Sequence, residues 1–165
     1  MFKRRKRGSE SDPPIYNDLR SQVLTLEPRT AGLRPTEELP DVWGVLLETG
    51  YPEGSSTLVA FADGTTSLYL SSGGGIIGGG EHDQVATATK RLVAAAQHQL
   101  EMFDPAEDLA VPTDGVATIR VLTFAGPLAS SAPEDDFGEG RHPLSGVFHT
   151  AHEVITELRL IEQQR

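Results

Sequence analysis

Cysteine is absent from the 165-residue chain, which excludes disulfides and thiol chemistry. No hydrophobic run approaches the ~20 residues that a membrane-spanning helix needs. No apolar segment of a signal peptide follows the basic N-terminus, so we expect a cytoplasmic protein without a membrane span. Aromatic residues make up only 6% of the chain. The hydrophobic fraction of 38% nevertheless suits one folded domain of this length.

Positive charge is scarce outside the first few residues. Lys3–Arg7 supplies five of the fourteen Lys and Arg residues, and the remaining nine face 24 Asp and Glu residues. A body this acidic repels nucleic acid. Lys3–Arg7 can contact an anionic surface weakly, at about 1 kcal/mol per cation near a membrane. We interpret residues 1–12 as a disordered basic tail and residues 13–165 as a single α+β domain.

The spacing of apolar residues predicts the order of the elements. The long segment 126–146, which contains three prolines, is expected to be a loop that is either mobile or ordered, with one more edge strand near Leu128 as an alternative. The other predicted elements are a helix from Asp12 to Leu26, strands at 43–48, 57–62 and 65–70, a helix at 81–103, a strand at 116–124 and a helix at 147–163.

Asp63-Gly64 is the clearest local signal, because both positions of a two-residue hairpin turn favour positive φ. A two-residue turn would place Val59 opposite Leu68 and Thr57 opposite Leu70. One face of this hairpin would then be a core face. The other face would carry small and apolar side chains and would meet solvent or a partner. The residues that we expect to bind a partner on that second face are Leu58, Ala60 and Tyr69.

The element order, helix–strand–strand–strand–helix–strand–(strand)–helix, predicts the fold class. Short connections make the first three strands antiparallel. We expect an α+β fold with a single antiparallel sheet of four or five strands. The helices would pack on one face of this sheet as a two-layer sandwich.

The stretch 71–81, Ser-Ser-Gly-Gly-Gly-Ile-Ile-Gly-Gly-Gly-Glu, is the candidate ligand motif. Gly73, Gly75 and Gly78 match G-x-G-x-x-G between a predicted strand and a predicted helix, as a nucleotide site requires. However, the preceding strand belongs to a hairpin and not to a parallel strand–helix–strand unit. Acidic residues in the first helical turn would also repel phosphate. The alternative is a structural loop, in which the glycines provide positive φ and close packing. The sequence favours this structural loop over a nucleotide site.

Three residues of the last predicted helix could ligate a metal. His149 and His152 are three positions apart, and Glu153 shares a helix face with His149. Neither His-Glu-x-x-His nor His-x-x-Glu-His occurs, so surface histidines are the favoured alternative to a metal-dependent enzyme.

No nucleophile motif and no carboxylate pair stands out, so we expect no enzyme activity and no cofactor. The element order resembles that of the small acidic secretion chaperones, and also that of the profilin and roadblock class. This resemblance rests on no sequence motif. It implies a non-catalytic, chaperone-like or protein-interaction module that binds a protein partner, with a homodimer expected. Small-ligand binding at 71–81 and metal chemistry at the histidines remain the alternatives.

Overall fold

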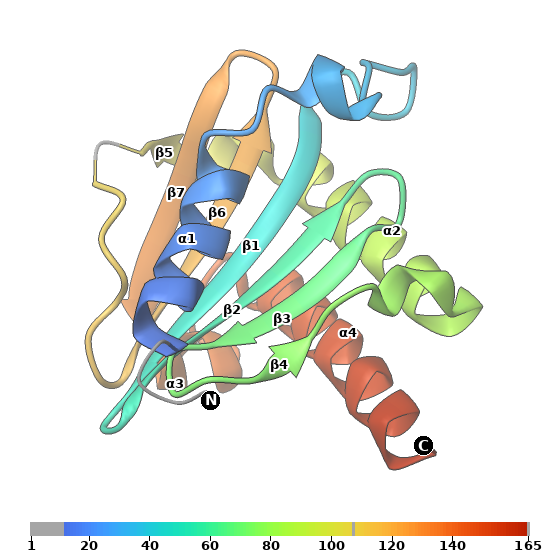
Figure 1. Ribbon diagram of the computed structural model, residues 1–165. Helices are drawn as coiled ribbons and strands as arrows, with labels where there is room; N and C mark the ends of the chain where they lie inside the picture. The colour runs from blue at the N-terminus through green and yellow to red at the C-terminus, as the bar shows by residue number, and fades with distance from the viewer. Residues whose placement is uncertain (1–11, 107, 165) are drawn as a thin grey trace.

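The computed structural model describes residues 12–106 and 108–164 (Figure 1). The predicted tail at residues 1–12, with Lys3–Arg7, therefore lies almost wholly outside the described residues. The helices are α1 (Asp12–Leu24), α2 (Asp83–His98), α3 (Glu134–Gly138) and α4 (Ser145–Gln163), with short 3-10 turns at Pro28–Ala31, Gly79–Glu81 and Leu100–Met102. The strands are β1 (Val42–Tyr51), β2 (Gly54–Phe61), β3 (Thr66–Leu70), β4 (Gly75–Ile76), β5 (Asp104–Pro105), β6 (Val116–Thr123) and β7 (Gly126–Pro133).

All strands join one antiparallel sheet in the order β4-β3-β2-β1-β6-β7-β5. The predicted α+β class with a single antiparallel sheet is confirmed. The sheet has seven strands, however, and not four or five. The two additional strands, β4 and β5, contain two residues each and lie at the edges. Such short edge strands offer little backbone for pairing with another chain.

The predicted loop at 126–146 is largely regular structure. Its first part is β7, which pairs with β6 along its whole length, from Thr123–Gly126 to Val116–Pro133. The helix α3 follows directly and buries Phe137. The alternative of one more strand near Leu128 is thus correct. The strand signal was weak because β7 is built from small residues between two prolines.

The helices lie on both faces of the sheet, contrary to the expectation of a two-layer sandwich. Figure 1 shows α1 in front of the sheet and α2 and α4 behind it. In β1, Val45 and Leu47 belong to the core beneath α2 and α4, whereas Leu46 between them packs with Tyr16 and Val23 of α1. The alternating side chains of a strand therefore serve two separate cores.

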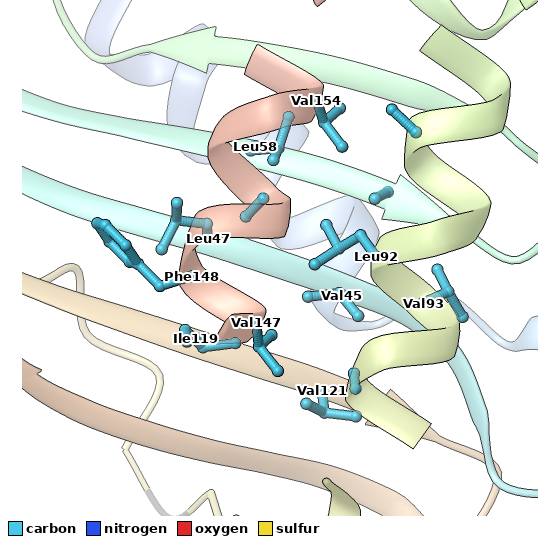
Figure 2. Close-up of a cluster of buried hydrophobic side chains, with 14 of the residues drawn as sticks. Val45, Leu47, Leu58, Leu92, Val93, Ile119, Val121, Val147, Phe148 and Val154 are labelled. Atoms are coloured by element: carbon cyan, nitrogen blue, oxygen red, sulfur yellow. The ribbon is translucent and has the colours of Figure 1, made fainter. Parts of the chain in front are cut away.

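The larger core lies between the sheet and the two helices that cover this face, α2 and α4. Figure 2 shows its side chains converging from both helices and from the central strands. Full burial of each such aliphatic side chain stabilises the fold by roughly 1.5–3 kcal/mol. The labelled members are Val45, Leu47, Leu58, Leu92, Val93, Ile119, Val121, Val147, Phe148 and Val154.

The turn between β2 and β3 has three residues instead of the predicted two. The Phe61 amide donates to the carbonyl of Thr65 (2.9 Å), and the Gly64 amide donates back to the carbonyl of Phe61 (2.9 Å), with Gly64 at φ 96°. The predicted pairs of the hairpin are therefore wrong by one residue, because Leu58 is opposite Leu68. This one-residue shift exchanges the faces on which the β3 side chains lie relative to β2.

Among the described helices, none combines the length and the apolar character that crossing a bilayer requires.

Candidate functional site

A carboxylate without solvent exposure lies at the centre of the sheet. Glu48 of β1 has 0% of its surface exposed. Arg120 of β6 donates from Nε to Glu48 Oε1 at 2.7 Å. Arg20 of α1 donates from Nε to Oε2 at 2.5 Å and from Nη2 to Oε1 at 2.9 Å. The hydroxyl of Thr57, which is opposite Glu48 on β2, donates to Oε2 at 2.7 Å. The carboxylate thus has two cationic partners, one from the sheet and one from α1.

Further hydrogen bonds extend this cluster to both sides. The hydroxyl of Tyr16 on α1 contacts Thr57 Oγ1 at 2.7 Å and accepts from Ser55 Oγ at 3.1 Å. Arg120 also donates to the carbonyls of Asp108 (3.0 Å) and Ala110 (2.8 Å). Arg20 donates to the intervening carbonyl of Leu109. We call the six side chains that hold this arrangement the Glu48 network: Tyr16, Arg20, Glu48, Ser55, Thr57 and Arg120.

The hydrogen bonds determine the protonation of Glu48. Burial by itself would raise the pKa of Glu48, but the hydrogen bonds from Arg20, Arg120 and Thr57 outweigh it, and the pKa is lowered. Burial would likewise lower the pKa of Arg20, and its contacts with Glu48 raise it instead. Glu48 and Arg20 are therefore both charged at neutral pH. Because four donors already surround the carboxylate, it is suited to holding α1 on the sheet and not to accepting a proton from a substrate.

The sequence contains an indication of this network, although the spacing of residues along the chain does not reveal it. Arg120 lies between Ile119 and Val121, and Glu48 follows Leu46 and Leu47, so both charges interrupt apolar strands. Charged residues are almost never fully buried unless they are paired. An Arg and a Glu within two apolar strands therefore indicate a mutual partner.

The glycine-rich stretch performs a packing role. A Cβ atom on Gly75 would lie 2.1 Å from the carbonyl oxygen of Leu68, and Gly73 and Gly78 have φ of 106° and 76°. The strand before the loop belongs to an antiparallel hairpin. The hollow beside the loop is bordered by Asp63 and Glu81, whose charge disfavours phosphate. The geometry therefore favours the structural interpretation of the G-x-G-x-x-G match.

The candidate metal ligands His149 and His152 both lie against the ring of Phe148, whereas Glu153 pairs with Arg91. The ring of His152 packs on Phe148 with 4.6 Å between ring centroids, and its Nε2 is buried without a hydrogen-bond partner. Burial, His149 and Arg159 lower the pKa of His152. Glu153 is exposed and lies 3.7 Å from Arg91. Within residues 12–106 and 108–164, no group of three or more His, Asp or Glu side chains is arranged to hold a metal ion.

The expected partner-binding residues do not share a surface. Leu58 and Ala60 are fully buried beneath α2 and α4. Tyr69 is also buried, but in the smaller core on the α1 face. The three-residue turn pairs Tyr69 with Thr57 and not, as predicted, with Leu58, so Tyr69 lies on the opposite face of the sheet from Leu58. A partner cannot reach these side chains on a folded chain.

Exposed apolar side chains gather instead at the end of the β1–β2 hairpin. Tyr51 is 42% exposed and Leu70 is 36% exposed, and both border one hollow of about 90 Å³. Ile15, which is 50% exposed, precedes Tyr16, whose hydroxyl contacts Ser55 in the wall of the same hollow. We call Ile15, Tyr51 and Leu70 the hairpin-end patch. No spacing in the sequence indicated it, because its members come from three different elements.

A second concave region lies beside the single tryptophan. A cleft of about 330 Å³ separates the segment after α1 from the β6–β7 turn, and Trp43 lines it together with Leu24, Arg29 and Phe124. The guanidinium of Arg29 lies 6.0 Å from the centroid of the Phe124 ring. The indole N–H of Trp43 is buried and has no hydrogen-bond partner among the described residues. We call this region the tryptophan cleft.

No family model, curated protein or solved structure matches this chain. Function is therefore inferred from the geometry alone.

Proposed function

We propose that the protein is a non-catalytic protein-binding module and that the hairpin-end patch contacts the partner. The observation that carries the proposal is that two large exposed apolar side chains, those of Tyr51 and Leu70, border one hollow at the end of the β1–β2 hairpin. Only seven such side chains are exposed in the described part of the chain, and three of them belong to this patch. Exposed apolar side chains that gather in one place, unlike single ones, mark contact sites.

The chemistry of the patch suits a protein partner. Tyrosine is enriched among the residues that dominate binding energy, because its ring buries a large area and its hydroxyl keeps a hydrogen bond. The hollow between Tyr51 and Leu70 is large enough only for a small group, such as the end of one side chain. A shallow surface with one such hollow suits a protein better than a free metabolite, which normally needs a cavity of roughly 300 Å³ or more.

The patch is also held in place before binding. Tyr51 is opposite Gly54 in the β1–β2 ladder, and Leu70 is opposite Ser56 in the β2–β3 ladder. Ile15 is fixed through its neighbour Tyr16 and the Glu48 network. A pre-organised surface loses little conformational entropy on association, which favours affinity.

A paired capture experiment tests the proposal. The full chain and the double variant Tyr51→Ser/Leu70→Ser are used as baits in native cell extract, and captured proteins are quantified by mass spectrometry. The matched control is Met102→Ser/Leu160→Ser, which removes two equally exposed apolar side chains outside the patch. We expect a partner that the control retains and the patch variant loses. Equal capture by all three baits would rule out the patch.

A measurement with the purified partner then gives the size of the effect. Loss of the Tyr51 and Leu70 side chains should raise the dissociation constant roughly 10- to 100-fold, as for residues at the centre of an interface. The thermal unfolding midpoints of both double variants should equal that of the unmodified chain, because all four side chains are exposed. A lower thermal unfolding midpoint for the patch variant would instead show that the loss of capture results from unfolding.

The second candidate function is binding of a small amphipathic ligand in the tryptophan cleft. Its volume lies at the lower end of the range for ligand sites, and it combines apolar walls with the cation of Arg29. Because Trp43 is the only tryptophan, its fluorescence reports on this cleft alone. Titration with aromatic and aliphatic carboxylates should change the emission if the cleft binds them. Thermal-shift assays with nucleotides test the glycine-rich loop in parallel, since ligand at ~100 times its Kd adds about 2.7 kcal/mol of stability.

A further inference from the structure

The side chains of Tyr51 and Leu70 lie on the same face of the sheet. Leu47 of β1 belongs to the larger core, so alternation along the strand places Tyr51 on that face as well. Leu68 and Leu70 stand in the same relation on β3. Between the two exposed side chains, β2 carries Gly54, which is opposite Tyr51 and has no side chain to fill the space. The result is the hollow of about 90 Å³ at the end of the β1–β2 hairpin, which projects at the lower left of Figure 1.

The walls and the rim of this hollow have different chemistry. Tyr51 and Leu70 provide apolar surface, whereas Glu53 provides a carboxylate and Ser72 a hydroxyl. Glu53 is exposed and forms no ion pair with another described residue. Among the described residues that line the hollow, there is no lysine or arginine. An occupant with an apolar stem and a positively charged end would complement both the walls and the rim.

The loops beside the end of β1 are also acidic. Gly50 pairs with Asp114, and the amide of Gly115 donates to the carbonyl of Gly50 at 3.0 Å. The carbonyl of Gly115 in turn accepts from the amide of Glu134 at 2.9 Å. Burial raises the pKa of Glu134 and the negative charge of Asp135 raises it further, so a cation brought to these loops would relieve repulsion. The electrostatic field at this end of the sheet therefore attracts a positively charged segment.

Given the proposed function, on which this assignment rests, we propose that the hollow receives a lysine side chain from a basic segment of the protein partner. The methylene stem of the lysine packs between Tyr51 and Leu70, and its ammonium reaches the carboxylate of Glu53 at the rim. Lysine suits a hollow of this size better than arginine, because its ammonium is a compact point charge on a flexible stem, whereas a guanidinium is a planar fork. The face of a ring such as that of Tyr51 also attracts a cation.

A matched series of peptides tests this assignment before the partner is identified. Fluorescein-labelled octalysine is titrated with the full-length chain and followed by fluorescence anisotropy at low salt. The corresponding oligomers of ornithine and of 2,4-diaminobutyrate carry the same charge on progressively shorter stems. General attraction to the acidic surface is the same for all three peptides, whereas only the longest stem fills the hollow and reaches Glu53. We expect the affinity to fall roughly two- to fourfold at each step, as for a buried methylene. Equal dissociation constants for the three peptides would overturn the proposal.

Substitutions at the walls and at the rim locate the effect. Tyr51→Ser/Leu70→Ser should abolish the dependence on stem length, whereas the control double variant of the capture experiment should retain it. Glu53→Gln should weaken the binding of octalysine roughly two- to fivefold, as for loss of an exposed ion pair. Glu101→Gln, at an exposed glutamate outside the patch, is the matched control and should weaken it less. Equal effects of the two glutamate variants, or a stem-length dependence that survives in Tyr51→Ser/Leu70→Ser, would overturn the proposal.

Capture from native extract separates the lysine assignment from the proposed function. Glu53→Gln and Glu101→Gln are used as additional baits, and we expect Glu53→Gln to recover less of the partner than Glu101→Gln. A partner that Tyr51→Ser/Leu70→Ser loses and Glu53→Gln recovers in full would leave the proposed function intact and overturn the lysine assignment. Equal capture by every bait would overturn the proposed function, whereas a dependence of peptide binding on stem length would still place a lysine in the hollow.

Discussion

The two faces of the sheet are stabilised by different chemistry. The face beneath α2 and α4 buries aliphatic side chains in one continuous cluster. The face beneath α1 combines a smaller apolar cluster around Trp43 and Leu46 with the Glu48 network. Burial of apolar surface is strong and non-directional, whereas a buried ion cluster requires a defined geometry. The first face therefore provides most of the stability, and the second positions α1.

The largest expected effect comes from the polar face. Glu48→Ala leaves Arg120 buried without its carboxylate, and removal of one partner of a buried ion pair costs about 3–5 kcal/mol. Urea denaturation of the variant and of the unmodified chain measures this loss. Glu53→Ala, at an exposed glutamate, is the matched control and should change stability by less than about 0.5 kcal/mol. A loss below about 1 kcal/mol for Glu48→Ala would contradict the paired, solvent-excluded geometry.

A substitution on the apolar face should reduce the free energy of unfolding by a comparable amount, with a wider range of expected values. Leu58→Ala removes a fully buried side chain between the sheet and α4, which costs about 2–5 kcal/mol because a cavity remains. Leu160→Ala removes an exposed leucine of α4 and should change little. Equal denaturation midpoints for the two leucine variants would show that α4 does not cover Leu58.

A smaller effect is expected for the attachment of α1 through Arg20. Arg20→Ala should cost about 1.5–3 kcal/mol, as for hydrogen bonds to a charged group, because Arg120 still pairs with Glu48. Arg91→Ala is the matched control, since its pair with Glu153 is exposed and contributes about 0–1 kcal/mol. Limited proteolysis should cleave residues 25–41 faster in Arg20→Ala than in the control. Equal losses in the two variants would show that the contact of Arg20 with Glu48 contributes no more than an exposed ion pair.

The smallest effect concerns pH. The pKa of His152 is lowered below its ordinary value of 6.5 by burial, by His149 and by Arg159, so the unfolded chain binds a proton more readily than the folded chain. The stability contribution of neutral His152 is therefore complete above pH 6.5 and decreases as the pH falls toward the lowered pKa. Unfolding free energies between about pH 5 and 8 measure it.

His152→Gln should flatten this dependence, and His98→Gln, at an exposed histidine, should not. An unchanged slope in His152→Gln would assign the pH dependence to other groups.

The helical and strand segments were predictable because their periodicity is local. The segments 81–103 and 147–163 correspond to α2 and α4, and 43–48 and 116–124 to β1 and β6, with boundaries that differ by several residues at some ends. The candidate sites were less predictable. Glycine spacing and histidine spacing described neighbours along the chain, whereas the Glu48 network joins residues up to 104 positions apart through α1, three strands and a loop.

The hairpin between β2 and β3 shows why the pairing of strands could not be predicted from the turn sequence alone. Asp63-Gly64 accommodates a two-residue or a three-residue turn, because either places glycine at positive φ. The pairing of β1 with β2 places Val45 opposite Ala60 and Leu47 opposite Leu58, which commits both residues of β2 to the core beneath the helices. Leu68 joins that core only in the three-residue register. Burial across three strands thus outweighed a local preference.

The sequence by itself determined the α+β class, the antiparallel hairpin and the two amphipathic helices, since these follow from alternation, turn chemistry and helical spacing over short stretches. Only the tertiary structure decided on which face of the sheet α1 lies and which charges meet beneath it. An apolar stripe such as Tyr16 and Val23 requires a covering surface but does not specify one of the two faces. That choice depends on Arg20 reaching Glu48, a contact between residues 28 positions apart that no local pattern contains.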